Sequence, residues 1–217
     1  MIKGLDEYIA FLDECRHLNN YSSVGAIVMN ANPFTNGHQY LINKALDNVD
    51  YLYVFVIEED KSFFSFNDRF NLVKSNCANF QNVSVIPTGN FIISQNTFGG
   101  YFQKENATDS DVNSMDFDPT IDVQIFGERI AKVLNITTRF AGSEPNCKVT
   151  NRYNETMKNL LPIYGVNFVE IERLEVDNNV VSATTVRNFI KNKEFEKIKP
   201  LVPEITYNFI REKYERD

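Results

Sequence analysis

The chain has 217 residues, of which 43% are hydrophobic and 24% are charged, as expected for one globular α/β domain with a sizeable core. A formal net charge of −7 argues against binding of nucleic acid or anionic lipid through overall charge, so a polyanion would have to bind in a local pocket. The three cysteines are widely spaced, and no segment suits a signal peptide or a membrane span. These features predict a cytoplasmic protein without a disulfide framework or a zinc site.

The first half of the chain predicts three strands that alternate with helices. Apolar residues at helical spacing within 1–20 predict an amphipathic helix, so we separate residues 1–22 from a main domain at 23–217. A buried strand at 24–30 and a helix at about 37–48 follow. The next predicted elements are a strand at 51–59, a helix at 66–80 with Asn67 or Ser65 as its N-cap, and a strand at 82–89.

The second half opens with a segment at 95–118 that is rich in Asn, Asp, Ser and Gly, which we expect to be a long loop. Pro119 then begins a helix to about residue 134. Further strands are predicted at 137–142 and 166–174, and helices at 150–161, from near Ser182, and from Val202 to Arg211. This alternation predicts a five-stranded parallel sheet with helices on both faces, which binds ligands at the carboxyl ends of its strands.

The junction between the first strand and its helix, NANPFTNGH at 30–38, predicts an anion site. Free N–H groups and the positive end of a helix dipole meet there, beside Thr35, His38 and a polar loop with Asn30 and Asn32. The pattern Thr35-x-Gly37-His38 is common by itself, and a surface turn is the alternative. Its position directly between a buried strand and an amphipathic helix favours a phosphate-binding site over a surface turn.

A second candidate anion site lies at VSATTVR, residues 181–187, where a helix is predicted to begin. Ser182, Thr184 and Thr185 supply hydroxyl groups there, and Arg187 supplies a charged fork. The alternative is a serine N-cap beside a solvated arginine.

Together the two elements resemble the signatures of the (H/T)xGH nucleotidylyltransferase superfamily, whose second signature is ISSTxxR-like. The departures are Thr35 in place of the first histidine, Val181 and Ala183. The segments EEDKSFFSFNDRFNLVK (58–74) and RFAGSEPNCKVTNRYNETM (139–157) add a similarity to the catalytic domain of the citrate lyase ligase family, from about Val24 to Phe209. The longer members of that family carry an acetyltransferase-like domain ahead of this one. We therefore expect either an isolated catalytic domain or a shorter relative with another acceptor.

The resemblance implies a Rossmann-like nucleotidylyltransferase fold that binds ATP with Mg²⁺. Thr35 and His38 would contact the ATP phosphates, with His38 stabilising charge on the α-phosphate, and Ser182, Thr184, Thr185 and Arg187 would hold the β- and γ-phosphates. Gly142, Ser143 and Glu144 would lie beside base and ribose. Lys61 and Arg69 would approach phosphate or an anionic substrate, the alternative being exposed solvated cations. Mg²⁺ would bridge phosphate oxygens, so no dedicated protein metal site is expected, and Asp109, Asp111, Asp116 and Asp118 are expected to be solvated.

The function implied by the resemblance is ATP-dependent adenylylation of acetate. The acyl group would then pass to the thiol of a prosthetic group on an acyl-carrier subunit, and the 95–118 loop with Arg152 and Tyr153 would shape the acceptor site. The expected partners are a small carboxylate and that acyl-carrier subunit. Two alternatives stay open, namely transfer of AMP or CMP onto a small phosphate ester, and a non-catalytic nucleotide-binding module.

Overall fold

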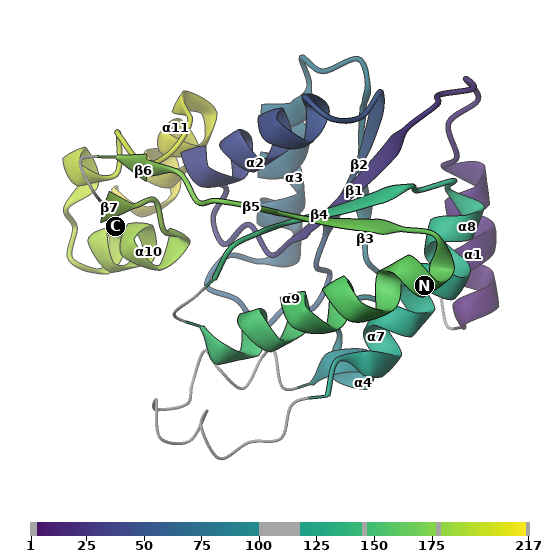
Figure 1. Ribbon diagram of the computed structural model, residues 1–217. Helices are drawn as coiled ribbons and strands as arrows, with labels where there is room; N and C mark the ends of the chain where they lie inside the picture. The colour runs from purple at the N-terminus through teal and green to yellow at the C-terminus, as the bar shows by residue number, and fades with distance from the viewer. Residues whose placement is uncertain (1–3, 100–117, 145–146, 177–178, 216–217) are drawn as a thin grey trace.

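The computed structural model describes residues 4–99, 118–144, 147–176 and 179–215 of the chain. Its centre is a sheet of five parallel strands in the order β3-β2-β1-β4-β5, which confirms the predicted sheet (Figure 1). The strands are β1 (Val24–Met29), β2 (Tyr51–Val56), β3 (Val83–Pro87), β4 (Thr138–Gly142) and β5 (Asn167–Ile171). Because the strand order reverses at β1, the switch point at which such sheets bind ligands lies between β1 and β4.

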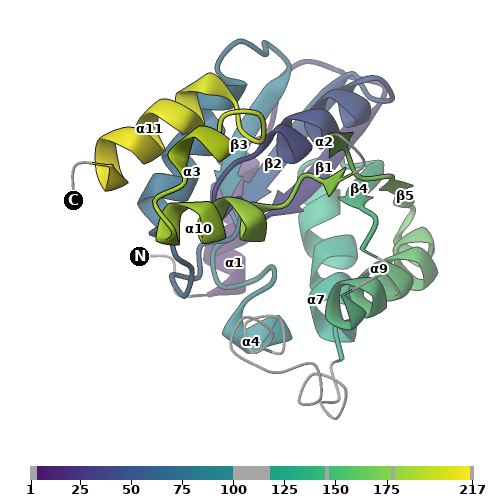
Figure 2. The same cartoon turned by 90° about the vertical axis from the view of Figure 1, so that its left-hand side faces the viewer.

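The two faces of the sheet are covered by different helices, because successive side chains of a strand point to opposite faces. Ile27, Leu52 and Val54 pack on the side of α2 (Asn36–Leu46) and α3 (Phe66–Cys77). Tyr53 and Phe55 pack on the other side, against α9 (Lys148–Leu160) and a helical segment made of α7 (Thr120–Ile125), the π-helical η1 (Phe126–Ile130) and α8 (Ala131–Val133). Figure 2 shows α2 and α3 on one side of the sheet and α7 and α9 on the other.

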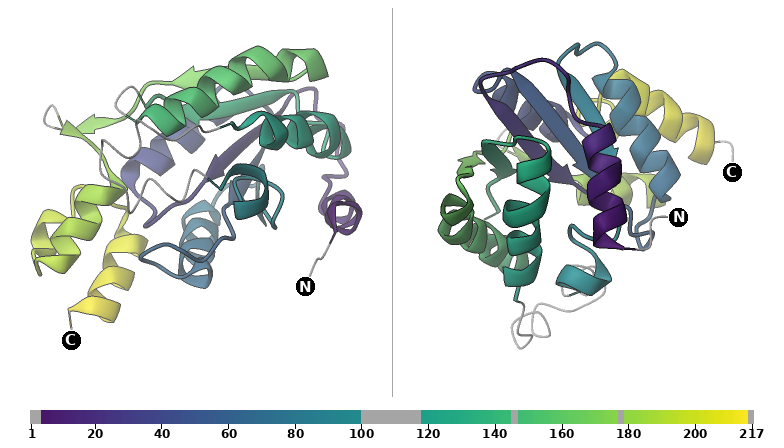
Figure 3. Two further views of the ribbon diagram at one scale, coloured as in Figure 1. Left: turned by 90° about the horizontal axis from the view of Figure 1, so that it is seen from below. Right: turned by 90° about the vertical axis from the view of Figure 1, so that its right-hand side faces the viewer.

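The predicted N-terminal helix is α1 (Leu5–Glu14), and it packs on the same core as the rest of the chain. Tyr8 and Leu12 are fully buried, and the Tyr8 hydroxyl donates a hydrogen bond to the Pro87 carbonyl at 2.9 Å. The helix lies beside α8 at the edge of the molecule (Figure 3). None of the helices in the described part of the chain is both long and apolar enough to cross a membrane.

The C-terminal residues form a separate cluster beside α3 on the left of Figure 1. It contains α10 (Ala183–Lys191), the short helix η3 (Phe195–Lys197) and α11 (Glu204–Tyr214), which share buried side chains such as Val186, Ile198 and Ile210. An unpredicted hairpin of two two-residue strands, β6 (Glu175–Val176) and β7 (Asn179–Val180), precedes α10. The cluster positions the start of α10 at the carboxyl end of β1.

Several boundaries differ from the predictions. The second and fifth strands end earlier, at Val56 and Ile171, and Ser65 rather than Asn67 caps α3, because its hydroxyl accepts the Asp68 N–H at 3.2 Å. The segment predicted as a loop from residue 95 begins with a helical turn, α4 (Gln95–Phe98), which buries Phe98. The remainder at 100–117, including Asp109, Asp111 and Asp116, lies outside the described residues, and Asp118 is exposed as expected.

Candidate functional site

The candidate site begins with the turn between β1 and α2, at the carboxyl end of the central strand. Ala31 adopts a left-handed backbone conformation with φ of 49°, which turns the chain sharply after β1. Thr35 is extended, with φ of −126°, and is the N-cap of α2. In the first turn of α2, the Asn36 N–H donates to the Leu201 carbonyl at 2.9 Å and the His38 N–H to the Thr35 carbonyl at 3.0 Å. Among the described residues, Gly37 therefore carries the N–H of this turn that has no hydrogen-bond partner, fewer free donors than the sequence predicted.

His38 is held in one orientation by its neighbours in this turn. Its Nδ1 accepts the Thr35 backbone N–H at 3.0 Å and lies 2.9 Å from Thr35 Oγ1, while its ring stacks on Phe34 with centroids 5.5 Å apart. Burial, and after it the charge of Arg173, lowers the pKa of His38 from 6.5 to about 4, so the imidazole is neutral near pH 7. With Nδ1 as an acceptor, the hydrogen-bond network assigns the remaining proton to Nε2. The ring therefore has a neutral Nε2–H donor for a ligand.

The second predicted element lies directly against this turn. Arg187 Nη1 donates to the Asn32 carbonyl at 2.7 Å, and Nη2 donates to Thr184 Oγ1 at 3.0 Å. A methyl group placed on Gly37 would lie 3.5 Å from the Val181 carbonyl oxygen, so the starts of α2 and α10 are close neighbours. The structure thus brings the two predicted anion elements together into one site.

The N-terminus of α10 is capped by Ser182, whose hydroxyl accepts the Thr184 N–H at 3.2 Å. Thr184 and Thr185 are exposed in the first turn. Their hydroxyl groups and the remaining free N–H groups of this turn are therefore accessible to an anion.

Asn32 carries an unusual unsatisfied donor between these elements. Its side chain is 3% exposed, and Oδ1 accepts the Phe64 N–H at 3.0 Å. Its Nδ2 is buried and has no hydrogen-bond partner among the described residues. An unpaired buried amide donor is unfavourable by about 1–3 kcal/mol, which is consistent with a site that receives an acceptor oxygen from a ligand.

Arg69 lies in the interior beneath the turn, whereas Asn30 is half-buried directly after β1, in the predicted loop. Arg69 is 0% exposed, and its nitrogens donate to the main-chain carbonyls of Asn30, Ile57, Glu59 and Phe64 at 2.7–3.2 Å. The Asn30 amide is itself bonded to Arg69 Nη1 and Ser62 Oγ. The burial of Arg69 and its carbonyl partners contradict both the expectation that it approaches phosphate or an anionic substrate and the alternative of an exposed cation. The assignment of Asn30 to the nucleotide site stays a prediction.

Lys61 stays on the surface of the loop after β2. Its Nζ lies 3.8 Å from Glu59 Oε1, and the side chain is about half exposed. Among the described residues, no hydrogen bond or ion pair joins Lys61 to the turn at 30–38.

Gly142 is the last residue of β4, and Ser143 and Glu144 follow it at the switch point, where the sequence predicted the strand to end. The Gly142 carbonyl accepts Asn154 Nδ2 at 3.1 Å, and the Ser143 N–H donates to the Ile171 carbonyl at 2.9 Å. A methyl group on Gly142 would meet no described heavy atom within 4 Å, so space is open on that side of the strand end.

Sequence analysis missed Arg173, which belongs to the same site. Its Nη1 lies 2.9 Å from Glu144 Oε1, Nη2 donates to the Val181 carbonyl at 3.3 Å, and its charge acts on His38. The signal that could have found it is its place at the carboxyl end of the strand predicted at 166–174, at the edge where the other site residues gather.

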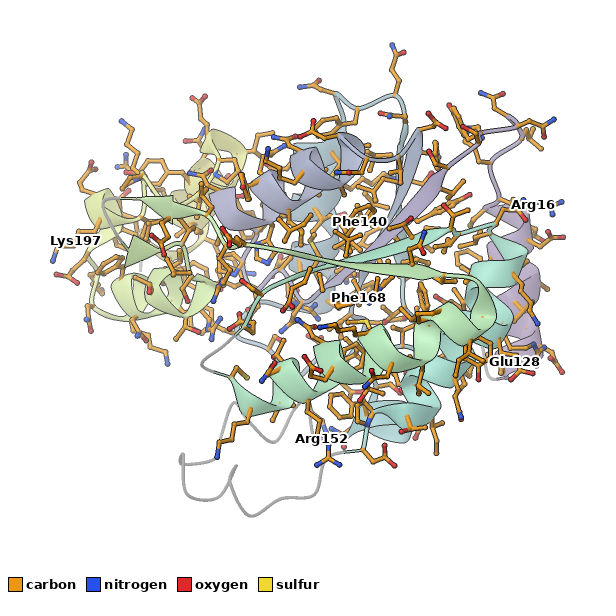
Figure 4. The ribbon with its side chains drawn as sticks, in the orientation of Figure 1. Arg16, Glu128, Phe140, Arg152, Phe168 and Lys197 are labelled. Atoms are coloured by element: carbon orange, nitrogen blue, oxygen red, sulfur yellow. The ribbon has the colours of Figure 1, made fainter. Side chains whose placement is uncertain are left out.

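The expected acceptor pair Arg152 and Tyr153 is divided between surface and interior. Arg152 is exposed on α9 (Figure 4), whereas Tyr153 is buried and its hydroxyl donates to Asp122 Oδ1 at 2.5 Å.

In the described ranges, no group of three or more His, Cys, Asp or Glu side chains is arranged to hold a metal ion.

Comparisons with known proteins agree with this geometry. The model of the citrate lyase ligase C-terminal domain family matches residues 24–210. The chain is 41% identical over 204 residues to a citrate (pro-3S)-lyase ligase of Klebsiella pneumoniae, an alignment that covers 90% of this chain and 58% of that protein. It is 38% identical over 212 residues to the corresponding ligase of Escherichia coli strain K12, with 95% and 58% covered. The chain thus spans little more than half the length of these curated relatives.

Among solved structures, the fold is similar to Thermotoga maritima TmcAL, which was crystallised with alpha-thio ATP. The TM-score is 0.51 with 16% sequence identity, and the match covers 89% of this chain and 56% of that chain. At this level of identity the similarity supports the Rossmann-like nucleotidylyltransferase fold.

Proposed function

Because the chain belongs to the citrate lyase ligase C-terminal domain family, we propose that it activates acetate with ATP. A carboxylate oxygen attacks the α-phosphorus, the bond from that phosphorus to the bridging oxygen breaks, and pyrophosphate leaves, which gives acetyl-adenylate. A thiolate on the prosthetic group of an acyl-carrier subunit then attacks the acetyl carbon, and AMP leaves. The full-length relatives are named as ligases of citrate lyase, and this chain matches 58% of their length.

One observation carries the proposal, namely the contact between Arg187 and the Asn32 carbonyl at 2.7 Å. It brings two helix N-termini together, the start of α2 with the Gly37 N–H and the start of α10 with its exposed hydroxyl groups, and it places a guanidinium beside them. Such a site is suited to a triphosphate, because several donors point to one region and need no rearrangement as charge develops.

Within this proposal, each site residue has a chemical task. The neutral Nε2–H of His38 donates to the α-phosphate, where negative charge increases during attack, and Asn32 Nδ2 donates to a phosphate oxygen. Ser182, Thr184, Thr185 and Arg187 hold the β- and γ-phosphates, and Gly142, Ser143 and Glu144 lie beside base and ribose. Arg173 adds positive charge near His38.

Mg²⁺ is part of the same proposal, since it would neutralise charge on the triphosphate. The described residues contain no metal-binding cluster, and Mg²⁺ commonly keeps several waters and binds phosphate oxygens. We therefore assign its coordination to the nucleotide and water.

The experiment is exchange of labelled pyrophosphate into ATP, catalysed by the purified chain with Mg²⁺. We expect the exchange to depend on acetate. Labelled pyrophosphate enters ATP only when it attacks an adenylate, and the proposed adenylate forms from acetate and ATP. Exchange that occurs without acetate, but with phosphopantetheine or a sugar phosphate, would instead assign nucleotidyl transfer to a phosphate ester. ATP binding without any exchange would assign a nucleotide-binding module.

A further inference from the structure

Arg139 on β4 is a buried cation on the α7 and α9 side of the sheet, and no hydrogen bond joins its side chain to the described residues. Its side chain is 3% exposed, and Nε and Nη1 have no hydrogen-bond partner within the described part of the protein. The guanidinium lies over the Phe126 ring with its central carbon 4.6 Å from the centroid. The aromatic face compensates part of the lost hydration of this charge, but it satisfies no N–H group.

The acidic residue that acts on Arg139 is Asp122, yet it does not form an ion pair with it. Asp122 Oδ2 accepts the Ile93 N–H at 2.5 Å and the Thr97 hydroxyl at 2.6 Å, and Oδ1 accepts the Tyr153 hydroxyl at 2.5 Å. No ion pair within 4 Å joins Arg139 to any described carboxylate. Burial raises the pKa of Asp122 and lowers the pKa of Arg139, and the charge of each group offsets part of the shift of the other. The carboxylate of Asp122 is therefore occupied by other donors.

A buried guanidinium that is neither paired nor hydrogen-bonded is strongly unfavourable, and native interiors rarely keep one without a functional reason. The chemical complement of its planar N–H groups is a carboxylate. We propose that Arg139 binds the carboxylate of a short-chain monocarboxylic acid, and that the cluster around it is the acyl-substrate subsite of this protein. The substrate identity in this inference rests on the function proposed above.

The surroundings of Arg139 suit such an acid. Phe126 covers the guanidinium, and the Phe98 and Tyr153 rings lie with centroids 5.3 Å apart, so aromatic surface is available to a methyl group. Because protein interiors are closely packed, we expect a short acyl chain to be accommodated here more readily than a long one. Arg139 therefore selects for the charge, while the aromatic side chains select for a small apolar tail.

The cluster is joined to the candidate ATP site through β4 and α9. Arg139 precedes Gly142 by three residues, which corresponds to about 10 Å along a strand. Asn154, the neighbour of Tyr153 on α9, donates to the Gly142 carbonyl at 3.1 Å. The proposed carboxylate subsite thus lies on the α7 and α9 side of the sheet, about 10 Å along β4 from the strand end that continues into Ser143 and Glu144.

The first test is thermal unfolding of the full chain in sodium acetate and in sodium chloride of equal ionic strength. Acetate should raise the unfolding midpoint of the wild type by about 3 °C at concentrations roughly tenfold above its dissociation constant, because it binds only the folded state. Arg139→Met should lose this rise. Without acetate it should unfold no earlier than the wild type, because methionine removes the unpaired buried charge. Arg129→Met is the matched control, since Arg129 lies on η1 and forms an exposed ion pair with Asp6 of α1, and it should keep the acetate response.

Three results would overturn the proposal: an acetate response in Arg139→Met equal to that of the wild type, an equal response to chloride, or no response of the wild type. If Arg139→Met does not fold, Arg139→Lys tests the proposal instead, because lysine keeps the positive charge but lacks the planar guanidinium group. In pyrophosphate exchange it should raise KM for acetate at least tenfold and leave KM for ATP unchanged. An unchanged KM for acetate contradicts the subsite while the proposed function stands. An acetate response that requires Arg139 without any exchange supports the subsite and contradicts the proposed function.

Discussion

Arg187 donates a hydrogen bond to the main-chain carbonyl of Asn32 at 2.7 Å, although 155 positions separate the two residues in the chain. The bond joins the first turn of α10 to the loop after β1. Two segments that are each unremarkable as anion sites become one site with two helix N-termini and a guanidinium. Three of the following predictions test this site directly.

Arg187→Lys should reduce kcat/KM for ATP in pyrophosphate exchange at least tenfold. A single ammonium group cannot contact the Asn32 carbonyl and Thr184 Oγ1 together and still present a planar fork to phosphate. Lys191→Met, at the exposed C-terminal end of the same helix, is the control and should match the wild type. Equal kcat/KM values for the two variants would contradict the assignment of Arg187.

His38→Ala should lower the exchange rate by about 10²–10³-fold, the typical loss of one donor to developing negative charge. The control is His17→Ala, because His17 is the other histidine of the chain and packs against Tyr51 with centroids 4.1 Å apart, away from the site. His17→Ala should affect stability without lowering the rate constant of the folded enzyme. A loss of less than tenfold in His38→Ala would remove His38 from the proposed mechanism.

The pH dependence of stability should also report on His38. Its pKa falls from 6.5 to about 4 on folding, so between these values the unfolded chain binds a proton that the folded chain does not. The free energy of unfolding should therefore be largest above pH 6.5 and decrease as the pH is lowered towards about 4. Urea unfolding of the wild type and of His38→Gln across this pH range measures the decrease in the free energy of unfolding. This decrease should be smaller in the variant, which lacks the imidazole. Parallel curves would show that His38 titrates normally in the folded protein.

Arg69→Met should lower the free energy of unfolding by about 3 kcal/mol or more, because it leaves several buried carbonyls without donors. Lys61→Met, on the exposed loop nearby, should change it by less than about 0.5 kcal/mol. Chemical denaturation compares the two. A small effect at Arg69 would mean that its bonds do not hold the loops after β1 and β2 together.

Gly37→Ala should reduce ATP-dependent exchange while leaving stability within about 1 kcal/mol of the wild type. The added methyl would lie 3.4 Å from Thr35 Oγ1 and 3.5 Å from the Val181 carbonyl, contacts that the fold can accommodate, and alanine favours helix. It would, however, occupy space between the two helix starts where we place the phosphates. KM for ATP and the thermal midpoint, measured together, check the prediction. A variant with unchanged KM would show that the phosphates lie elsewhere.

Much of the fold could be predicted from the chain because it depends on local patterns. The apolar runs at 24–30 and 51–59 and the helical spacing after Gly37 identify strands and a helix from neighbouring residues alone. The hairpin of β6 and β7 was missed because two-residue strands leave no readable period. The helical turn α4 was missed for a related reason, since a segment of four residues is defined by its Ser94 cap and buried Phe98 rather than by periodicity.

By itself, the sequence determined the alternation of strands and helices, the parallel sheet and the two helix starts that carry Thr35, His38 and Arg187. Only the tertiary structure decided which arginine has which role. Arg69 is enclosed by carbonyls, Arg173 lies near His38, and Arg139 is buried without an acceptor. The physical reason is that helix and strand formation depends on residues close in sequence. The environment of a charged side chain is instead set by packing between segments that are far apart in the chain.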